Sequence, residues 1–257
     1  MARNDEYDAM DGIRRSSLWI MNKSPAHFRE AMDSPPEPTP ALAFGVAAHK
    51  YILEKESFDE EFAVAPDVDR RTMRGKEDYA AFIASLDGRA AISSGELDQI
   101  KAMAAAVDSH PTARRYLSGA HERVYLWEDP MTGEPCKCKV DSIGEVDGVL
   151  TVTDYKTTES CEDGHFEKSC RKYGYHFQAG MYCEGVFMNE LTRPEFVFVA
   201  QEKKPPYAVR VYRCDEGFVA QGYDKFRELI GLYHRCREAG EWPGYPDADL
   251  LEEAYHG

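Results

Sequence analysis

The sequence has no long apolar run and no sign of a targeting segment. No apolar stretch approaches the ~18–20 residues of a membrane-spanning helix, so we expect no contact with a membrane. Residues 1–12 are acidic and polar, which is unlike a signal peptide. The chain also has no internal repeat and no low-complexity tract. We therefore expect a cytoplasmic globular protein.

Closely spaced cysteine pairs of the metal-binding kind are also missing. The seven cysteines include no Cys-x-x-Cys pair, and the nearest two are Cys136 and Cys138. Structural zinc sites and iron–sulfur clusters usually need such pairs, so the spacing argues against both. In a cytoplasmic chain we expect the cysteines to be reduced and mostly buried thiols.

Positive charge is scarce. The chain has 31 Lys and Arg residues against 46 Asp and Glu, which gives a net charge of −15. A general nucleic-acid binder usually carries a basic domain, so this balance argues against one. It still permits an enzyme that holds nucleic acid in one basic channel, because phosphate contacts are local and an acidic exterior discourages loose binding.

Helical and strand patterns alternate along a chain that is long enough to bury a proper core. The apolar spacing predicts helices over residues 17–24, 25–33, 41–54, 76–86, 94–108, 111–118, 174–190 and 217–236. It predicts strands over residues 62–65, 123–127, 135–143, 149–157, 195–200 and 208–212. The proline-rich stretch 34–40 is expected to be a stiff linker or a surface loop.

These elements predict a mixed α/β fold with one central sheet flanked by helices. Residues 121–158 should form a three-stranded antiparallel meander, with Asp147-Gly148 as a hairpin turn. No convincing domain boundary interrupts the pattern. We expect residues 1–257 to be a single domain, with residues 1–15 and 240–257 as less ordered tails.

A carboxylate and a lysine follow a buried strand at the end of this meander. Asp154 and Lys156 are two residues apart, so their side chains project to the same face, and Asp141 lies on the preceding strand. Two carboxylates and an ammonium are poor stabilisers but suit a divalent metal and a phosphate. Mg²⁺ prefers a few carboxylates and retains several waters, and the Tyr155 carbonyl offers a further oxygen. Lys156 would orient or deprotonate the attacking water, or stabilise the developing charge. This set predicts phosphodiester hydrolysis.

Three other segments carry candidate residues. His49 lies four residues after Gly45 in helix 41–54, which is apolar nearly all round and should be buried. A histidine there is most often a core residue, so a site role is the alternative interpretation. Gln178 and Tyr182 are four apart and share one face of helix 174–190.

A basic stretch precedes the helix predicted at residue 76. Its cations are Arg70, Arg71, Arg74 and Lys76. They are either a solvated charge cluster or a loop that contacts phosphates.

The acid–x–lysine pattern alone is common, and a surface salt bridge without a functional role is its simplest interpretation. Its position directly after a buried strand favours a functional site. Several further segments, in the same order along the chain, resemble the nuclease domain of RecE-type exonucleases (exonuclease VIII) within the PD-(D/E)XK nuclease superfamily. These segments are residues 12–18, 24–28, 44–49, 69–76, 125–130, 136–141, 154–158 and 175–182.

The resemblance implies a PD-(D/E)XK core and a Mg²⁺-dependent exonuclease, with Mn²⁺ as a substitute and one or two ions per site. Its substrate would be double-stranded DNA ends, degraded 5′ to 3′ to leave 3′ overhangs for a single-strand annealing protein of the RecT type. It further implies a homo-oligomeric ring and a phage or prophage protein in a bacterial cytoplasm. The present chain resembles the nuclease domain alone.

The resemblance also implies roles for individual residues. The catalytic set comprises His49, Asp141, Asp154, Lys156, Gln178 and Tyr182. The metal ligands would come from Asp141, Asp154, Tyr155, His49 and Glu122, where Glu122 is an additional acid at the start of the first meander strand.

Two alternatives remain open at this point. One is a catalytically inactive protein of the same fold that binds DNA ends and assists recombination. The other is an acidic globular protein with a surface salt bridge at Asp154 and Lys156. An endonuclease on the same fold would differ by cutting closed circular DNA.

Overall fold

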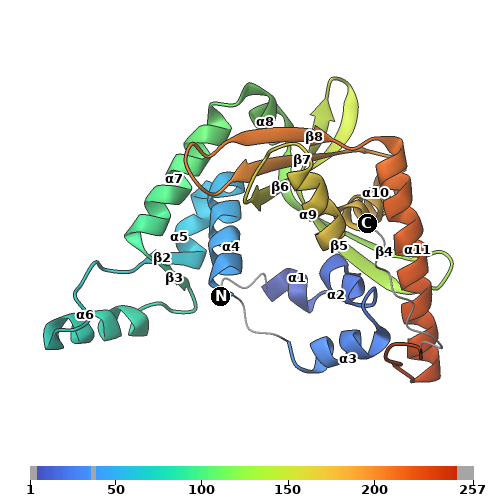
Figure 1. Ribbon diagram of the computed structural model, residues 1–257, viewed down its shortest axis with the longest axis horizontal. Helices are drawn as coiled ribbons and strands as arrows, with labels where there is room; N and C mark the ends of the chain where they lie inside the picture. The colour runs from blue at the N-terminus through green and yellow to red at the C-terminus, as the bar shows by residue number, and fades with distance from the viewer. Residues whose placement is uncertain (1–4, 36–38, 248–257) are drawn as a thin grey trace, which may run out of the picture.

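A computed structural model describes residues 5–35 and 39–247 (Figure 1). The helices are α1 Asp5–Ala9, α2 Arg15–Ile20, α3 Pro25–Asp33, α4 Pro40–Leu53, η1 Lys55–Ser57, α5 Phe58–Glu61, α6 Met73–Ala84, α7 Ser94–Asp108, α8 Pro111–Tyr116, α9 His165–Tyr173, α10 Tyr175–Glu190 and α11 Glu216–Ala239. The strands are β1 Ile13–Arg14, β2 Phe62–Val64, β3 Ala90–Ile92, β4 Ala120–Glu128, β5 Pro135–Val146, β6 Val149–Thr158, β7 Glu195–Glu202 and β8 Val209–Arg213.

The main sheet has six strands and is mixed, as the sequence predicts. Strands β4, β5 and β6 form the expected antiparallel meander. Strand β7 pairs parallel to β6, and β8 closes the sheet antiparallel to β7. The short strand β1 pairs parallel to the start of β5, at Cys136 and Lys137. One edge of β5 therefore pairs with two strands, with β1 at its start and with β6 from Ser142 onward.

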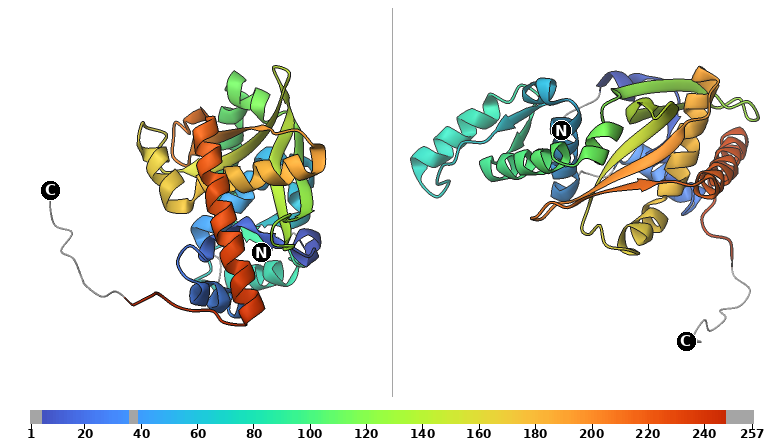
Figure 2. Two further views of the ribbon diagram at one scale, coloured as in Figure 1. Left: turned by 90° about the vertical axis from the view of Figure 1, so that its right-hand side faces the viewer. Right: turned by 90° about the horizontal axis from the view of Figure 1, so that it is seen from above.

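Helices cover both faces of this sheet (Figure 2). On one face, α10 and α11 pack over the apolar side of the meander and of β7, around buried side chains such as Phe177 and Phe226. On the other face, α4, α7 and α8 pack against β6 and β7 around Tyr155 and Val199. Alternate side chains of β6 thus enter different layers, with Asp154 and Lys156 on the α10 side.

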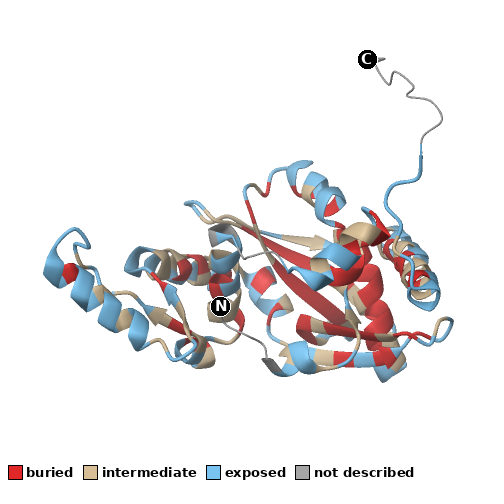
Figure 3. Ribbon diagram, turned by 90° about the horizontal axis from the view of Figure 1, so that it is seen from below, coloured by how far each residue is buried: buried red, intermediate tan, exposed pale blue. Residues whose placement is uncertain are grey.

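A second, smaller cluster lies beside the sheet. The two-stranded parallel sheet β2–β3 packs with α4, α5 and α7 around Phe58, Phe62 and Met103. Helix α6 extends outward from it (Figures 1 and 3). Gly75 is the one buried residue of this helix.

Several elements differ from the sequence prediction. The strands β1 and β3 are too short to give a period, and α9 lies in a stretch for which the sequence predicts neither a helix nor a strand. Helix α6 begins at Met73, where Thr72 caps it by accepting the Gly75 N–H at 3.0 Å, so the predicted basic loop is partly helical.

Two other expectations need correction or qualification. Helix α4 is not buried all round, because Leu42 is 53% exposed. Residues 5–15, expected within a less ordered tail, form α1 and β1, and Lys137 Nζ donates to the carbonyls of Tyr7 (2.9 Å) and Met10 (2.5 Å). Residues 240–247 contain no helix or strand, and residues 248–257 lie outside the described part.

All seven cysteines are free, and all except Cys214 are buried. No helix in the described ranges has the length and apolar character to cross a membrane.

Candidate active site

The site forms where strands β5 and β6 part. Their backbone pairing ends at Ser142 and Thr153. Just beyond this pair, the Asp141 carboxylate accepts the Tyr155 N–H at 2.8 Å. A side chain thus takes over a backbone hydrogen bond of the sheet. The consequence is an opening in the sheet lined by polar groups.

Three carboxylates lie in one row across this opening. The β4–β5 ladder pairs the residues on either side of Glu122 and Asp141, so these two are level. The β5–β6 register places Asp154 level with Asp141 on the other side. Glu122 has a φ of +54°, a left-handed conformation that is costly for a residue with a Cβ. Such strain is typical of functional positions.

Helix α4 supplies a histidine to this row. His49 Nε2 lies 3.0 Å from Asp141 Oδ2, and Nδ1 lies 3.7 Å from Glu122 Oε1. One donor atom from each of the three residues falls within 4.8 Å of the others. Burial lowers the pKa of His49, but the adjacent carboxylates of Asp141 and Glu122 together raise it by more.

The acceptor capacity of this group is not fully used. Glu122 Oε1 is buried and has no hydrogen-bond partner among the described residues. Its other oxygen is paired with Lys139. Buried polar atoms without a partner are rare, and here the orphaned oxygen points to an absent cation. His49, Glu122 and Asp141 therefore fit a divalent metal.

Asp154 and Lys156 form the second half of the site. Their side chains are ion-paired, and the Gln178 amide of α10 donates to the other Asp154 oxygen. Asp154 is 1% exposed. Burial raises the pKa of Asp154, and the nearby Asp141 charge raises it further. Burial lowers the pKa of Lys156, but the Asp154 and Asp141 charges outweigh this and keep it protonated.

Two tyrosines predicted for the site lie close to it in different ways. The Tyr155 backbone is within the site through its N–H, while its hydroxyl donates to Gln201 at 2.5 Å on the opposite side of the sheet. Tyr182 lies one turn along α10 from Gln178 and packs its ring against Phe196, with centroids 6.4 Å apart. Burial, and the negative charges around it, raise the pKa of Tyr182.

The basic cluster is not brought to the carboxylates. Arg70, Arg71, Arg74 and Lys76 precede or open α6, which projects from the far end of the molecule (Figures 1 and 2). There Arg70 stacks over Tyr79 at 4.6 Å, and Arg74 lies 3.8 Å from Asp78.

Three residues beside the site had no role in the sequence interpretation. Lys139 pairs with Glu122, and the Tyr175 ring centroid lies 5.3 Å from Lys156 Nζ. Arg15 is held by the carbonyl of Gly174 at 2.9 Å, near Asp154. The alternation of β5 places Lys139 on the Asp141 face, which was a usable signal. Arg15 and Tyr175 come from helices whose docking the sequence does not encode locally.

The fold and this arrangement define the core of a PD-(D/E)XK nuclease, in which an acid, a second acid and a lysine two residues after the second acid meet on a mixed sheet. The chain belongs to the family described as PDDEXK-like domain of unknown function, which matches residues 15–253.

One solved structure supports the fold. The crystal structure of a candidate exonuclease from Eubacterium rectale aligns with a TM-score of 0.64 at 17% identity, over 98% of this chain and 94% of that one. A second structure, of SSO0001, covers 72% of this chain and 84% of its own at 17% identity, but its TM-score of 0.31 is too low to support an argument. No curated protein matches the chain.

Proposed function

We propose that the protein is a Mg²⁺-dependent exonuclease that degrades double-stranded DNA from its ends, 5′ to 3′, and leaves 3′ single-stranded overhangs. The observation that carries this proposal is the convergence of Asp141, Asp154 and Lys156 at the opening between β5 and β6. Two carboxylates and an ammonium at one opening of a buried sheet have no structural advantage over apolar residues of similar volume. They do suit a cation and a phosphate.

The donor set favours a hard divalent cation. Carboxylate oxygens suit Mg²⁺ and Mn²⁺, and the His49 imidazole makes Mn²⁺ an acceptable substitute. Asp141, Glu122 and His49 would hold the ion, with Asp154 across the opening. When bound, such an ion polarises a phosphodiester and makes its bound water more acidic.

The remaining residues act on the phosphate or orient the acids. Lys156 is charged and 22% exposed, so its ammonium can contact the charge that develops on the phosphate oxygens. Gln178 fixes one oxygen of Asp154 and leaves the other beside Lys156. Lys139 holds Glu122 in the same way.

The exonuclease assignment draws on two supports. The solved relative from Eubacterium rectale is described as a candidate exonuclease. The resemblance to RecE-type enzymes adds the polarity, a ring of subunits, a single-strand annealing partner and a phage-type recombination role. The basic residues before and within α6 would then contact DNA away from the catalytic row.

The test is digestion of linear duplexes labelled at the 5′ or the 3′ end, with and without Mg²⁺. The wild-type protein should degrade linear but not closed circular duplex, and should release the 5′ label first. Asp154→Asn and Lys156→Ala should each lower the rate by at least about 10²–10³-fold. Lys156→Ala removes the positive charge at the phosphate, and Asp154→Asn removes the carboxylate that faces the ion and holds Lys156.

Lys225→Ala is the matched control, because Lys225 forms a surface ion pair with Glu228 on α11, 2.7 Å long. It should keep the wild-type rate. Full activity in either site variant contradicts the proposal. Protection of DNA ends in Mg²⁺, without degradation, would instead identify the inactive end-binding alternative.

A further inference from the structure

A hollow of about 350 Å³ opens between α9 and the end of β6 that follows Lys156. Its lining includes Thr158, two residues further along β6, and Tyr175, whose ring lies 5.3 Å from Lys156 Nζ. Residues two apart on a strand share a face and are separated by about 7 Å. The hollow, which we call the α9 hollow, therefore continues the active site beyond its catalytic lysine.

Helix α9 turns a basic face toward this hollow. His165, Lys168, Ser169 and Lys172 line it and are spaced three and four residues apart, so they form one stripe of the helix. Lys203, from the loop after β7, adds another cation. Among the described residues, Glu159 is the only acid in the lining, and it is paired with Lys203 at 2.6 Å.

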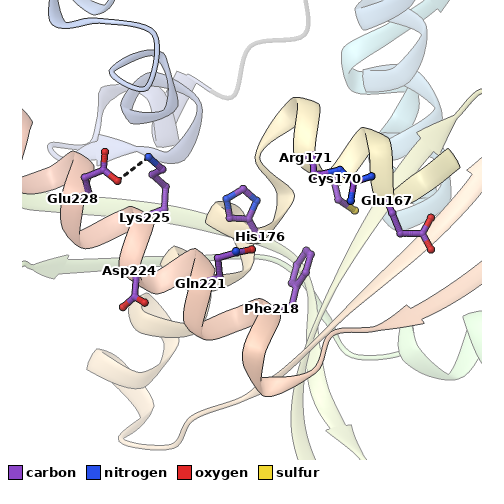
Figure 4. A pocket seen from close by; sticks show the side chains of 9 residues that line it. All are labelled: Glu167, Cys170, Arg171, His176, Phe218, Gln221, Asp224, Lys225 and Glu228. Carbon is purple, nitrogen blue, oxygen red and sulfur yellow. Dashed lines mark hydrogen bonds and ion pairs between the residues drawn. The ribbon is translucent and has the colours of Figure 1, made fainter. Parts of the chain in front are cut away.

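The opposite side of α9 has a different character. Glu167, Cys170 and Arg171 line a separate hollow of about 700 Å³ between α9, α10 and α11 (Figure 4). The helix thus directs two lysines toward the α9 hollow and places its acid, together with Arg171, on the other side. In a chain with a net charge of −15, this sorting marks a local site for an anion.

An aromatic platform completes the α9 hollow. Tyr173 is 47% exposed, although large aromatic rings are usually covered. Its ring lies 5.9 Å from that of Tyr175 at an angle of 31°, and Lys172 Nζ lies 5.1 Å from its centroid. Cations that follow a backbone, beside exposed aromatic rings on which bases stack, are the features that bind single-stranded nucleic acid.

We propose that the α9 hollow binds the single-stranded DNA nucleotides next to the scissile phosphate. Lys168 and Lys172 contact phosphates, and Tyr173 stacks on an unpaired base. This inference rests on the proposed nuclease function and adds a substrate requirement to it. The terminal base pairs must separate before the strand reaches Lys156.

The test measures binding of a short fluorescent oligothymidylate by anisotropy, without divalent metal so that no cleavage occurs. Tyr173→Ala should weaken binding about tenfold, since stacking contributes about 1–3 kcal/mol per base. Tyr173→Phe keeps the ring and should bind like the wild type. The double variant Lys168→Ala/Lys172→Ala should reduce the slope of log affinity against log salt by about 1.4, since each phosphate contact on a single strand contributes about 0.7.

Arg171→Ala is the matched control, because it removes a cation from the same helix on the side away from the α9 hollow. It should leave affinity and salt slope unchanged. Melting temperatures check that each variant is folded. A double-lysine variant that behaves like Arg171→Ala overturns the inference. So does an equal loss for Tyr173→Ala on a blunt duplex, whose bases are paired.

These outcomes are distinct from failure of the proposed function. A wild-type protein that degrades duplex, while the α9 variants bind oligothymidylate normally, contradicts the α9 hollow alone. A wild-type protein that binds oligothymidylate through α9, but degrades no DNA in Mg²⁺, contradicts the nuclease proposal alone.

Discussion

At the residue scale, the site is built from side chains in costly surroundings. Glu122 has a left-handed backbone conformation, and Asp154 is a carboxylate with almost no exposure. Neither choice stabilises the fold. Proteins retain such positions where the arrangement serves binding or chemistry.

The cost at Glu122 can be measured with two substitutions that both remove the carboxylate. Glu122→Gly should be more stable than Glu122→Ala by about 1–2 kcal/mol, because only glycine adopts this φ without strain. Both variants should bind Mn²⁺ more weakly than the wild type. Urea unfolding and metal titration provide the two readouts, and equal stability of the two variants would show that the backbone at residue 122 is not strained.

Residue spacing predicted only part of the site. The pairing of Asp154 with Lys156 follows from the two-residue period of a strand, and Asp141 follows from the meander. His49 meets Glu122 and Asp141 only through the docking of α4 on the sheet, which involves contacts distant in sequence. The burial of the Glu122 oxygen without a hydrogen-bond partner also results from this docking, so no local sequence pattern predicts it.

At the element scale, the β4–β5 hairpin is fastened to α11. The buried Asp129 accepts hydrogen bonds from Arg227 Nη2 at 3.2 Å and from the Thr132 hydroxyl at 2.6 Å. Glu134 binds His234 and Arg237 on the same helix, at 2.7 and 2.9 Å. Helix α11 therefore holds the turn of the hairpin whose other end carries Glu122 and Asp141.

This fastening predicts a pH dependence of stability. Burial raises the pKa of Asp129, but hydrogen bonds from Arg227 and Thr132 outweigh it, so the folded pKa lies below the ordinary 3.8. Its contribution is complete above pH ~4 and declines as the pH falls through the lowered pKa. Asp129→Asn should lower the free energy of unfolding by about 1.5–3 kcal/mol at pH 7. The difference from wild type should shrink at pH 3.

Urea unfolding at both pH values checks this expectation. Asp163→Asn is the control, since Asp163 is 87% exposed in its pair with Arg210 and should show no measurable change. An Asp129→Asn effect of the same size at pH 3 and pH 7 would exclude the ionised carboxylate as its source.

Helices α10 and α11 cross without room for a methyl group. A Cβ at Gly222 would lie 1.7 Å from the His176 carbonyl oxygen, which is backbone and cannot give way. Gly222→Ala should therefore lower the free energy of unfolding by at least about 1–3 kcal/mol. It should also reduce activity, because α10 carries Gln178.

Gly231→Ala is the matched comparison on the same helix. Its nearest neighbour would be the mobile end of Arg235, 3.4 Å away. This variant should gain about 0.5–1 kcal/mol from helix propensity. Thermal unfolding of the two variants compares their stabilities. Similar melting temperatures would mean that α10 and α11 can move apart at Gly222 without loss of stability.

Element prediction succeeded where apolar periodicity was long. Helix α11 and the meander were found close to their observed bounds. Helix α9 was missed because it buries only Phe166 and Cys170, so the apolar period barely repeats within its nine residues. The glycines at both its ends, Gly164 and Gly174, were the available signal, since both have positive φ.

At the scale of the whole molecule, a chain with a net charge of −15 still gathers a few cations beside the candidate site. Lys139, Lys156 and Arg15 lie beside the opening, and the lysines of α9 line the adjoining hollow, while the cations near α6 lie at the far end. Composition alone could not predict this distribution, because the net charge averages over surfaces that face different directions. Helix α4, which carries His49, also contributes to two apolar clusters. One is the cluster around Tyr155 and Val199, and the other is the smaller cluster around Phe58 and Phe62.

The alkylation of the buried cysteine thiols can report when individual helices and strands open. Burial raises the pKa of Cys138, Cys170 and Cys183, so these thiols resist alkylation while the fold is closed. Each should react only when its own element opens, so pulsed alkylation read by mass spectrometry would time the opening of β5, α9 and α10 separately. We expect Cys170 on the short helix α9 to react before Cys138 in the central strand. Identical rates at both would mean that β5, which carries Asp141, and α9, which lines the α9 hollow, open and close as one unit.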